Sequence, residues 1–189
     1  MFLLKFKDRV GSMKKIIVIG CPGSGKSTFA KKLHKICGIP LFHLDMLYWN
    51  ADKTVVEKSV FLEKLSDVLR KNEWIIDGNY ASTMELRMKE CDTVIFLDYP
   101  TEICLDGIKE RKGKQRSDLP WIENGEDDKD FIEFITSYNS ESRPKVIELL
   151  KKYADKKRNK KQVIFDLLFV YLSILQTQIN EAVVIVPCA

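Results

Sequence analysis

The chain has 189 residues, of which 45% are hydrophobic and 31% are charged, and its formal net charge at pH 7 is +4. This length and composition fit one globular domain and exclude a disordered or fibrous chain, while so small a net charge does not indicate a nucleic-acid-binding protein. The five cysteines form no Cys-x-x-Cys pair, which favours reduced thiols and a cytoplasmic location.

Residues 1–12 are expected to be an N-terminal extension. They lack the long apolar stretch and the small-residue cleavage site of a secretory signal. Met13 directly precedes a β-branched run, so it could itself be the natural start of the protein. We therefore expect the domain proper to begin at residue 13.

Strand and helix signals alternate along residues 13–165. Residues 15–19 form a β-branched run without polar alternation, as expected of a parallel strand that is covered on both faces. Helical periodicity predicts helices at residues 26–37 and 55–70, and further apolar runs predict strands at residues 40–44, 73–77, 93–98 and 162–165. This alternation predicts an α/β fold with a mainly parallel sheet, whose binding crevice lies at the carboxyl ends of the strands.

Residues 20–27 read Gly-Cys-Pro-Gly-Ser-Gly-Lys-Ser and follow the first predicted strand. The spacing is that of a phosphate-binding loop, whose backbone N–H groups converge on phosphate oxygens at a helix N-terminus. We expect Lys26 to reach the terminal phosphates and the Ser27 hydroxyl to ligate Mg²⁺. An Asn-Lys-x-Asp guanine reader is missing from the sequence, which favours ATP over GTP. The expected nucleotide-binding residues are Gly20, Cys21, Pro22, Gly23, Ser24, Gly25, Lys26, Ser27 and Thr28.

Two aspartates at predicted strand ends are candidates for the chemistry. Asp45 could orient or deprotonate the hydroxyl of a phosphoryl acceptor, and Asp77 could hold Mg²⁺ through water. Each could instead cap a helix, because aspartate is a strong capping residue.

The apolar periodicity is lost between about residues 109 and 130. A connection this long and polar is typical of a mobile lid, although a solvated surface excursion is the alternative. Arg111 and Arg116 flank this segment. Arg87 could bind an acceptor phosphate or pair with Glu90 on its own helix.

Several segments together resemble the small bacterial P-loop proteins of the DNA topology modulation, or FlaR-like, family, which are related to adenylate and shikimate kinases. Besides the phosphate loop, these are His-Leu-Asp-Met-Leu-Tyr-Trp at residues 43–49, Trp-Ile-Ile-Asp-Gly-Asn-Tyr at residues 74–80, Val-Ile-Phe-Leu-Asp-Tyr-Pro at residues 94–100 and Ser-Arg-Pro-Lys at residues 142–145. The resemblance implies a nucleoside-monophosphate-kinase-like P-loop fold, with a five-stranded parallel sheet flanked by helices and a lid.

The resemblance also implies roles for three arginines. Arg111 and Arg116 would close over the nucleotide, unless they are merely solvated, and Arg143 resembles the arginine that follows the lid of these kinases. One departure is clear: adenylate kinases continue the segment similar to Ile76-Asp77-Gly78 with Phe-Pro-Arg, whereas Asn79 and Tyr80 follow here. This departure weakens the specific case for AMP as the acceptor.

The C-terminal part of the chain leaves several interpretations open. Residues 151–161 are rich in lysine and could be a nucleic-acid patch or a solvated helix end. Residues 166–189, where the resemblance stops, begin with an apolar run that is too short to span a membrane. This tail could be a partner-binding helix, a dimer contact or the result of an altered reading frame.

The sequence as a whole predicts an ATP- and Mg²⁺-dependent kinase domain at residues 13–165. It would transfer the γ-phosphoryl group of ATP to a nucleotide or small hydroxyl acceptor. The expected magnesium ligands are Ser27 and Asp77, and the expected catalytic residues are Lys26, Asp45, Arg111, Arg116 and Arg143. An ATP-regulated DNA-binding or topology-modulating protein is the alternative, and the oligomeric state stays open.

Overall fold

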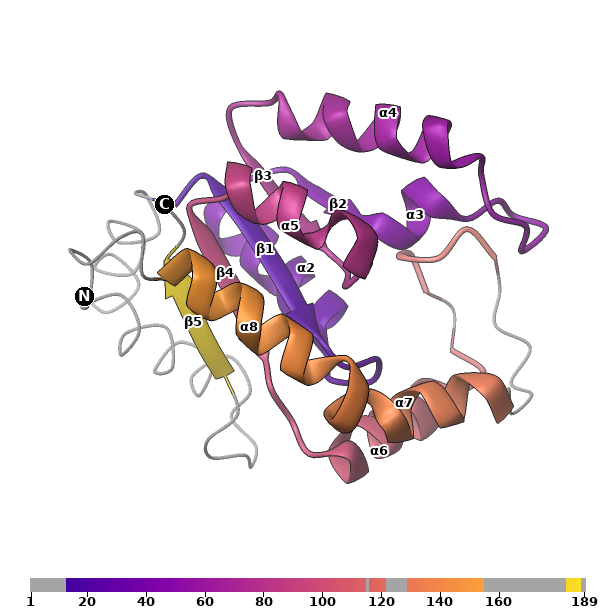
Figure 1. Cartoon of the computed structure of the whole chain (residues 1–189). Coiled ribbons are helices and arrows are strands. Elements are labelled where there is room, and N and C mark those ends of the chain that lie inside the picture. The colour runs from indigo at the N-terminus through magenta and orange to yellow at the C-terminus, as the bar shows by residue number, and fades with distance from the viewer. Residues whose placement is uncertain (1–12, 115, 122–128, 155–182, 188–189) are drawn as a thin grey trace.

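The computed structural model describes residues 13–114, 116–121, 129–154 and 183–187, and these residues form one five-stranded sheet with helices on both faces (Figure 1). The strand order is β2-β3-β1-β4-β5. The first four strands run parallel, and they are β1 (Lys15–Gly20), β2 (Leu41–His43), β3 (Trp74–Asp77) and β4 (Thr93–Leu97). These four confirm the predicted α/β fold with a parallel sheet.

The fifth strand differs from its prediction. β5 (Val183–Pro187) runs antiparallel to β4, with Thr93 opposite Pro187 and Leu97 opposite Val183. The strand expected at residues 162–165 lies outside the described residues, as do residues 1–12. The tail therefore supplies a β-branched run, Val-Val-Ile-Val, that pairs with the edge of β4 and makes the sheet mixed.

The two helices predicted at residues 26–37 and 55–70 lie close to their predicted positions. Gly38, with φ at 76°, ends α2, and its N–H donates to the His34 carbonyl. The helices are α2 (Lys26–Cys37), α3 (Leu44–Tyr48), α4 (Lys58–Leu69), α5 (Ala81–Glu90), α6 (Thr101–Arg111), α7 (Lys129–Glu141) and α8 (Arg143–Ala154). Within the described residues, no helix is long and apolar enough to cross a membrane.

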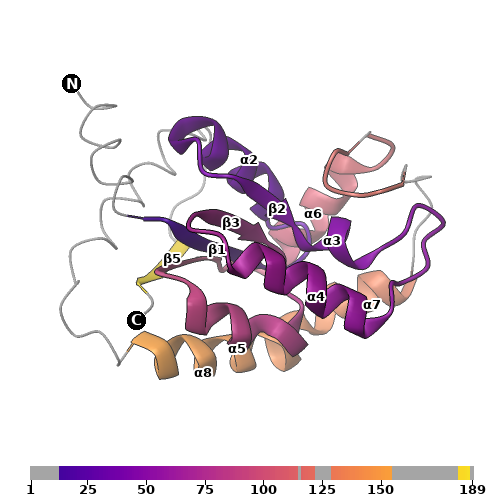
Figure 2. The same ribbon diagram turned by 90° about the horizontal axis from the view of Figure 1, so that it is seen from above.

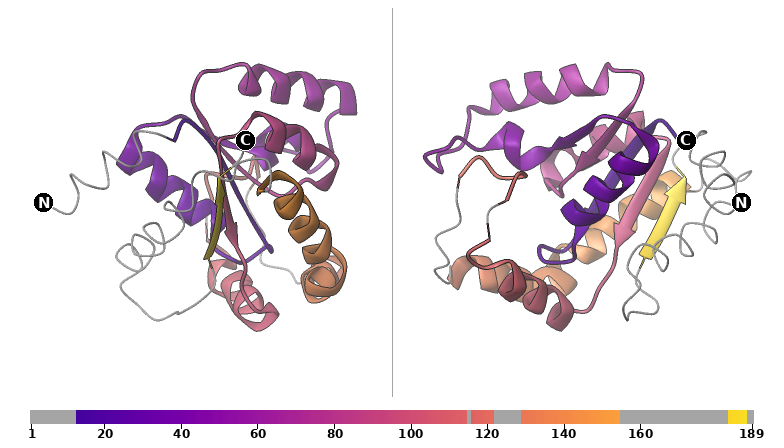
Figure 3. Two further views of the ribbon diagram at one scale, coloured as in Figure 1. Left: turned by 60° about the vertical axis from the view of Figure 1, so that its left-hand side comes forward. Right: turned by 180° about the vertical axis from the view of Figure 1, so that it is seen from behind.

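Alternate side chains of β1 enter two separate cores, which is why its sequence shows no polar alternation. Ile16 and Val18 pack in a core with residues of α2, α6 and α7. Ile17 and Ile19 pack in a second core with residues of α3, α4, α5 and α8. Figure 2 shows α2 on one side of the sheet and α5 and α8 on the other, and Figure 3 shows both layers with the sheet between them. The carboxyl ends of the parallel strands remain free to carry a site.

The irregular segment at the predicted lid is shorter than expected. α6 extends to Arg111 and α7 begins at Lys129, so both ends of the 109–130 region are helical. The described part of the connection passes beside α3 (Figure 1), where the Trp121 ring lies 5.5 Å from the Trp49 ring, centroid to centroid. Residues 112–121, hereafter called the lid segment, therefore reach over to the β2–α3 side of the sheet; residues 115 and 122–128 lie outside the described part of the chain.

Candidate phosphate-binding and acceptor site

The phosphate loop joins β1 to α2, in the strand–loop–helix context that the sequence predicts. Gly23 and Gly25 have φ angles of 85° and 80°, and Gly25 is the N-cap of α2. Such left-handed backbone is readily adopted only by glycine. Lys26 and Ser27 are the first two residues of α2 and are half-buried, so they lie at the N-terminal end where the helix dipole favours anions.

Helix α6 packs backbone to backbone against this loop. A Cβ atom added to Gly23 would lie 1.9 Å from the Cys104 carbonyl oxygen, and one added to Gly107 would lie 2.2 Å from the Gly23 carbonyl oxygen. Cys21 is 2% exposed and its thiol is hydrogen-bonded with that of Cys104. This hydrogen bond, together with burial, raises the pKa of Cys21. Cys21 therefore faces the core, and only its backbone can face a phosphate.

Asp77 lies at the end of β3, next to β1. One carboxylate oxygen, Oδ2, lies 2.8 Å from Nδ1 of His43, while Oδ1 is buried without a hydrogen-bond partner among the described residues. The phosphate-loop hydroxyl of Ser24 is likewise buried and unpaired within this part of the chain. Unpaired buried oxygens are costly, and a carboxylate oxygen of this kind suits the water shell of Mg²⁺. The residues present thus fit a magnesium ion, and Asp77 does not cap a helix, because the N-cap of α5 is Tyr80.

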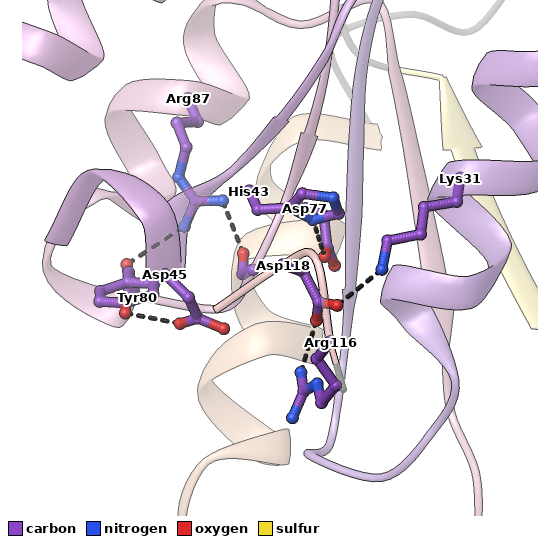
Figure 4. Close-up of polar contacts among 9 residues, drawn as sticks. Lys31, His43, Asp45, Asp77, Tyr80, Arg87, Arg116 and Asp118 are labelled. Atoms are coloured by element: carbon purple, nitrogen blue, oxygen red, sulfur yellow. Dashed lines mark hydrogen bonds and ion pairs between the residues drawn. The ribbon is translucent and has the colours of Figure 1, made fainter. Parts of the chain in front are cut away.

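Asp45 lies in the first turn of α3 rather than at a strand end, because β2 stops at His43. His43 is the N-cap of α3, so the capping alternative for Asp45 is wrong. The hydroxyl of Tyr80 donates a hydrogen bond of 2.7 Å to Oδ1 of Asp45 (Figure 4). Burial, and then the neighbouring Asp45 carboxylate, raise the pKa of Tyr80, so this hydroxyl remains a donor.

Tyr80 belongs to a connected set of five aromatic side chains, which we call the aromatic cluster. Tyr48 is the central ring, 4.9 Å from Tyr80 and 5.2 Å from both Trp49 and Phe61, centroid to centroid. Trp121 extends the cluster into the lid segment through its edge-to-face contact with Trp49. The cluster members are Tyr48, Trp49, Phe61, Tyr80 and Trp121.

Each of the three predicted catalytic arginines has a partner in this structure. Arg143, at the start of α8, donates from Nε and Nη2 to the two carboxylate oxygens of Asp98, at 2.8 and 2.6 Å. Arg116 donates to the Asp118 carboxylate in the lid segment. Arg111 lies over the Phe131 ring of α7, 5.8 Å from its centroid. The sequence did not indicate any of these partners, and the catalytic roles of the three arginines stay a prediction.

Asp118 was not singled out from the sequence, nor was Lys31. The Asp118 carboxylate is 2% exposed and accepts hydrogen bonds from Lys31 of α2 and from Arg116 (Figure 4). Burial by itself raises the pKa of Asp118, but the hydrogen bonds from Arg116 and Lys31 outweigh it and hold the pKa well below its usual range. No motif in the sequence signals this triad, because Lys31 is 87 positions away from Asp118.

Arg87 does neither of the two things proposed for it. Its side chain is fully buried and donates to the carbonyls of Gly78, Asn79, Tyr80 and Thr83, and no bond to Glu90 occurs among the described residues. Burial lowers the pKa of Arg87 to about 9. Asn79, which the sequence showed only as a departure from adenylate kinases, pairs with Gly20 at the start of the phosphate loop.

Known proteins of related sequence are kinases. The chain is 29% identical to the adenylate kinase of Thermosipho melanesiensis over 119 residues, 59% of this chain and 54% of that protein. It is 27% identical to the adenylate kinase of Thermotoga maritima over 110 residues, 54% of this chain and 49% of that protein. The chain therefore spans about half the length of the curated relatives it matches.

Two solved shikimate kinases share the fold at low sequence identity. The enzyme from Bacteroides thetaiotaomicron gives a TM-score of 0.55 at 19% identity, covering 88% of this chain and 100% of that one. The enzyme from Acinetobacter baumannii, in complex with shikimate, gives 0.50 at 14% identity, covering 92% and 99%. These likenesses confirm the P-loop kinase fold, and the sequence relatives support the expected relation to adenylate kinases, whereas the DNA topology modulation label is not confirmed.

The AAA domain family matches residues 16–133, a region that runs from β1 through the phosphate loop into α7. This region contains the phosphate loop, Asp45, Asp77 and the lid segment. Because the match covers more than half of the sequence, the chain belongs to the AAA domain family.

Proposed function

We propose that this protein is an ATP-dependent phosphotransferase that transfers the γ-phosphoryl group of ATP to a hydroxyl group of a small molecule. One observation carries the proposal. Along the carboxyl edge of the sheet, the phosphate loop after β1 is followed by Asp77, at the end of the neighbouring strand β3, and then by the hydrogen-bonded pair of Asp45 and Tyr80 beside β2. Donor phosphates and an acceptor carboxylate thus share one edge of the sheet, as in-line phosphoryl transfer requires.

On the donor side, the backbone of residues 20–28 binds the phosphates and Lys26 reaches the terminal ones. The Ser27 hydroxyl and Asp77, through water, would hold Mg²⁺, which neutralises charge on the phosphates. The unpaired Oδ1 of Asp77 supports this assignment. His43 fixes the other oxygen of the same carboxylate, so Oδ1 keeps one orientation.

On the acceptor side, Asp45 receives the proton of the acceptor hydroxyl or orients that hydroxyl by accepting its hydrogen bond. Tyr80 holds the Asp45 carboxylate through Oδ1 and leaves Oδ2 for the acceptor. The rings of the aromatic cluster that flank the pair, Tyr48 and Trp49, offer apolar surface to the carbon skeleton of the acceptor.

The arginines favour a small hydroxyl compound over a nucleoside monophosphate. A phosphate-bearing acceptor calls for an available guanidinium, and residues 41–90, which form the acceptor side, contain only Arg70 and Arg87. Arg87 is buried and saturated with carbonyl contacts, and Arg70 is exposed on α4 beside Asp67. The acceptor proposed here therefore carries no phosphate group before the reaction.

The arginines of the lid side serve the transferring phosphate. Arg116 and Arg143 are each held by a carboxylate in the present structure. Bound ATP brings phosphate oxygens that compete with Asp118 and Asp98 for these guanidinium groups. The proposal assigns Arg116 and Arg143 to stabilising charge on the γ-phosphoryl group, with Arg111 in support at the end of α6.

The test is an ADP-formation screen with ATP and Mg²⁺. Sugars, polyols, hydroxy acids and nucleosides would be compared with nucleoside monophosphates, each against the Lys26→Ala variant and against Lys35→Ala, which removes an exposed lysine at the far end of α2. At least one unphosphorylated hydroxyl compound should raise ADP formation in the wild type and in Lys35→Ala but not in Lys26→Ala. If no compound exceeds the Lys26→Ala background, the kinase assignment is wrong; if only nucleoside monophosphates do, the acceptor class is wrong.

The DNA-binding alternative is not favoured. Of the lysine-rich residues 151–161, the structure describes 151–154, and there Lys152 forms an ion pair with Glu85 of α5. The remaining residues of the run lie outside the described part of the chain. No described contact therefore supports a nucleic-acid surface.

A further inference from the structure

The side chain of Asn79 is bonded to both backbone groups of one residue, Gly20. The Gly20 N–H donates to Oδ1 of Asn79 at 3.0 Å, and Nδ2 of Asn79 donates to the Gly20 carbonyl at 2.7 Å. Gly20 is the last residue of β1 and the first residue of the phosphate loop. The two bonds therefore fix the backbone of the residue at which the phosphate loop leaves the sheet.

The two Asn79–Gly20 hydrogen bonds continue the hydrogen-bonded pairing of β1 with β3 beyond the end of β3. Val18 is opposite Asp77 in the parallel register, and the Gly78 N–H donates to the Val18 carbonyl. After Gly78 the backbone turns away, with φ angles of 134° at Gly78 and 37° at Tyr80. The carboxamide of Asn79 has the same donor and acceptor groups as a peptide unit, so it takes the place of the next backbone partner of Gly20.

Arg87 holds the turn that presents Asn79. Its guanidinium donates to the carbonyls of Gly78, Asn79 and Tyr80, the three residues that leave the strand. A left-handed conformation at a tyrosine is costly and persists only where surrounding contacts fix it. The fully buried Arg87 supplies such contacts from about two turns further along α5.

One turn thereby connects three parts of the site. It begins at Asp77, continues through Asn79 to the phosphate loop, and ends at Tyr80, whose hydroxyl holds Asp45. We propose that Asn79 is a positioning residue for the phosphate loop and that Arg87 positions the loop indirectly by fixing the turn around Asn79. This inference rests on the proposed function only in taking the loop to bind nucleotide phosphates.

The two hydrogen bonds between Asn79 and Gly20, hereafter called the clamp, hold a residue that has no room for a side chain. A Cβ atom there would lie 2.7 Å from the Leu97 carbonyl oxygen and 2.7 Å from Oγ of Ser24. Gly20 is thus enclosed by β4 and the loop on one side and by the Asn79 carboxamide on the other. A loop fixed in this way loses less conformational freedom when it binds phosphate, so the clamp favours binding by preorganisation.

The first test is ADP binding, measured by calorimetry with Mg²⁺ and without any acceptor. Replacing Asn79 with Ala removes both bonds, so the Kd for ADP should rise by about tenfold, as expected from the loss of two hydrogen bonds. Asn139→Ala is the matched control, because its amide bonds to Thr101 on the outer helices, and it should leave the Kd within about twofold of the wild type. An Asn79→Ala Kd within that same range overturns the proposal.

Amide hydrogen exchange gives a second readout that does not require nucleotide binding. In the wild-type apoprotein the Gly20 amide should exchange slowly, because its N–H is donated to Asn79. Asn79→Asp keeps an oxygen for this N–H but loses the donor to the Gly20 carbonyl, so it should retain slow exchange at Gly20 while weakening ADP binding. Fast exchange of the Gly20 amide in the wild type would contradict the clamp, even if Asn79→Ala did not fold.

The two tests separate this inference from the proposed function. If the wild type binds ADP and Lys26→Ala does not, but no acceptor supports ADP formation, the kinase assignment fails while the clamp can still hold. If the wild type binds no ADP and its Gly20 amide exchanges rapidly, both fail. Arg87→Lys provides a further check, because lysine cannot reach three carbonyls with a planar fork; it should weaken ADP binding and speed exchange at Gly20 together.

Discussion

The ammonium group of Lys31, on α2, lies 2.6 Å from the buried carboxylate of Asp118 in the lid segment. This contact ties the segment to the helix that begins at the phosphate loop. Arg116 shares the same carboxylate. The Lys31–Asp118 ion pair thus holds the segment against α2, and the contribution of the Asp118 carboxylate to stability can be measured through its pH dependence.

Asp118→Asn should lower the free energy of unfolding by about 2 kcal/mol at pH 7, because it removes the charge of a buried carboxylate from two part-buried hydrogen bonds. The pKa of Asp118 is depressed in the folded protein, so its contribution is fully present above the unfolded value of about 4 and is lost as the pH falls further. The difference between wild type and variant should therefore be constant from pH 7 to about 5 and shrink below about 4. Urea unfolding across this pH range measures the difference in the free energy of unfolding.

Asp67→Asn is the control for that experiment. It removes one partner of an ion pair with Arg70 on the exposed surface of α4. A pair of this kind contributes between about 0 and 1 kcal/mol. A difference for Asp118→Asn that stayed unchanged down to pH 3 would show that the carboxylate does not carry the predicted charge interaction.

Tyr80→Phe should separate acceptor chemistry from nucleotide binding. The change removes the hydroxyl bonded to Asp45 and keeps the ring packed against Tyr48 and Phe61. We expect a loss of about 1 kcal/mol in the free energy of unfolding, an unchanged Kd for ADP, and about tenfold slower acceptor-dependent ADP formation. Tyr153→Phe, which removes the hydroxyl bonded to Glu85, should leave turnover unaffected. Equal turnover in the two variants would argue against a role for the Asp45–Tyr80 pair.

Gly107→Ala should disturb the phosphate loop through the contact of the loop with α6. Its new Cβ would lie 2.2 Å from the Gly23 carbonyl oxygen, so α6 or the loop must shift. Overpacking of this kind costs about 1–3 kcal/mol, and the Kd for ADP should rise with it. Gly38→Ala meets open space but has a left-handed backbone; it should cost about 1 kcal/mol without changing the Kd. An ADP affinity equal in both variants would mean that α6 does not support the loop.

Asp77→Asn should reduce the effect of Mg²⁺ on nucleotide binding. The unpaired Oδ1 would lose its negative charge, and loss of such an outer ligand typically weakens metal binding by about tenfold or more. The ratio of the ADP Kd in EDTA to that in Mg²⁺, measured by calorimetry, should therefore fall towards one. Asp106→Asn removes an exposed carboxylate on α6 and should keep the wild-type ratio. A wild-type ratio in Asp77→Asn would show that Asp77 does not belong to the metal site.

Local patterns in the sequence determined the parallel sheet and the phosphate loop. The β-branched run of β1, the glycines of residues 20–25 and the Lys-Ser pair that follows specify strand, turn and helix through short-range sterics and hydrogen bonding. The aspartates could be placed near the loop for a related reason, because the carboxyl ends of parallel strands meet at one edge of a sheet. Each strand, the turn of the phosphate loop and the helix after it depend on residues close together in the chain.

Tertiary structure alone decided which side chains pair. Asn79 reaches Gly20 across 59 positions, Arg143 reaches Asp98 across 45, and Lys31 reaches Asp118 across 87. Arg87 looked like a ligand for phosphate in the sequence, yet packing buried it against three carbonyls of the turn that presents Asn79. A guanidinium or carboxamide can satisfy many partners, so its role follows from the backbone groups that the fold places within its reach, and those are set by contacts distant in sequence.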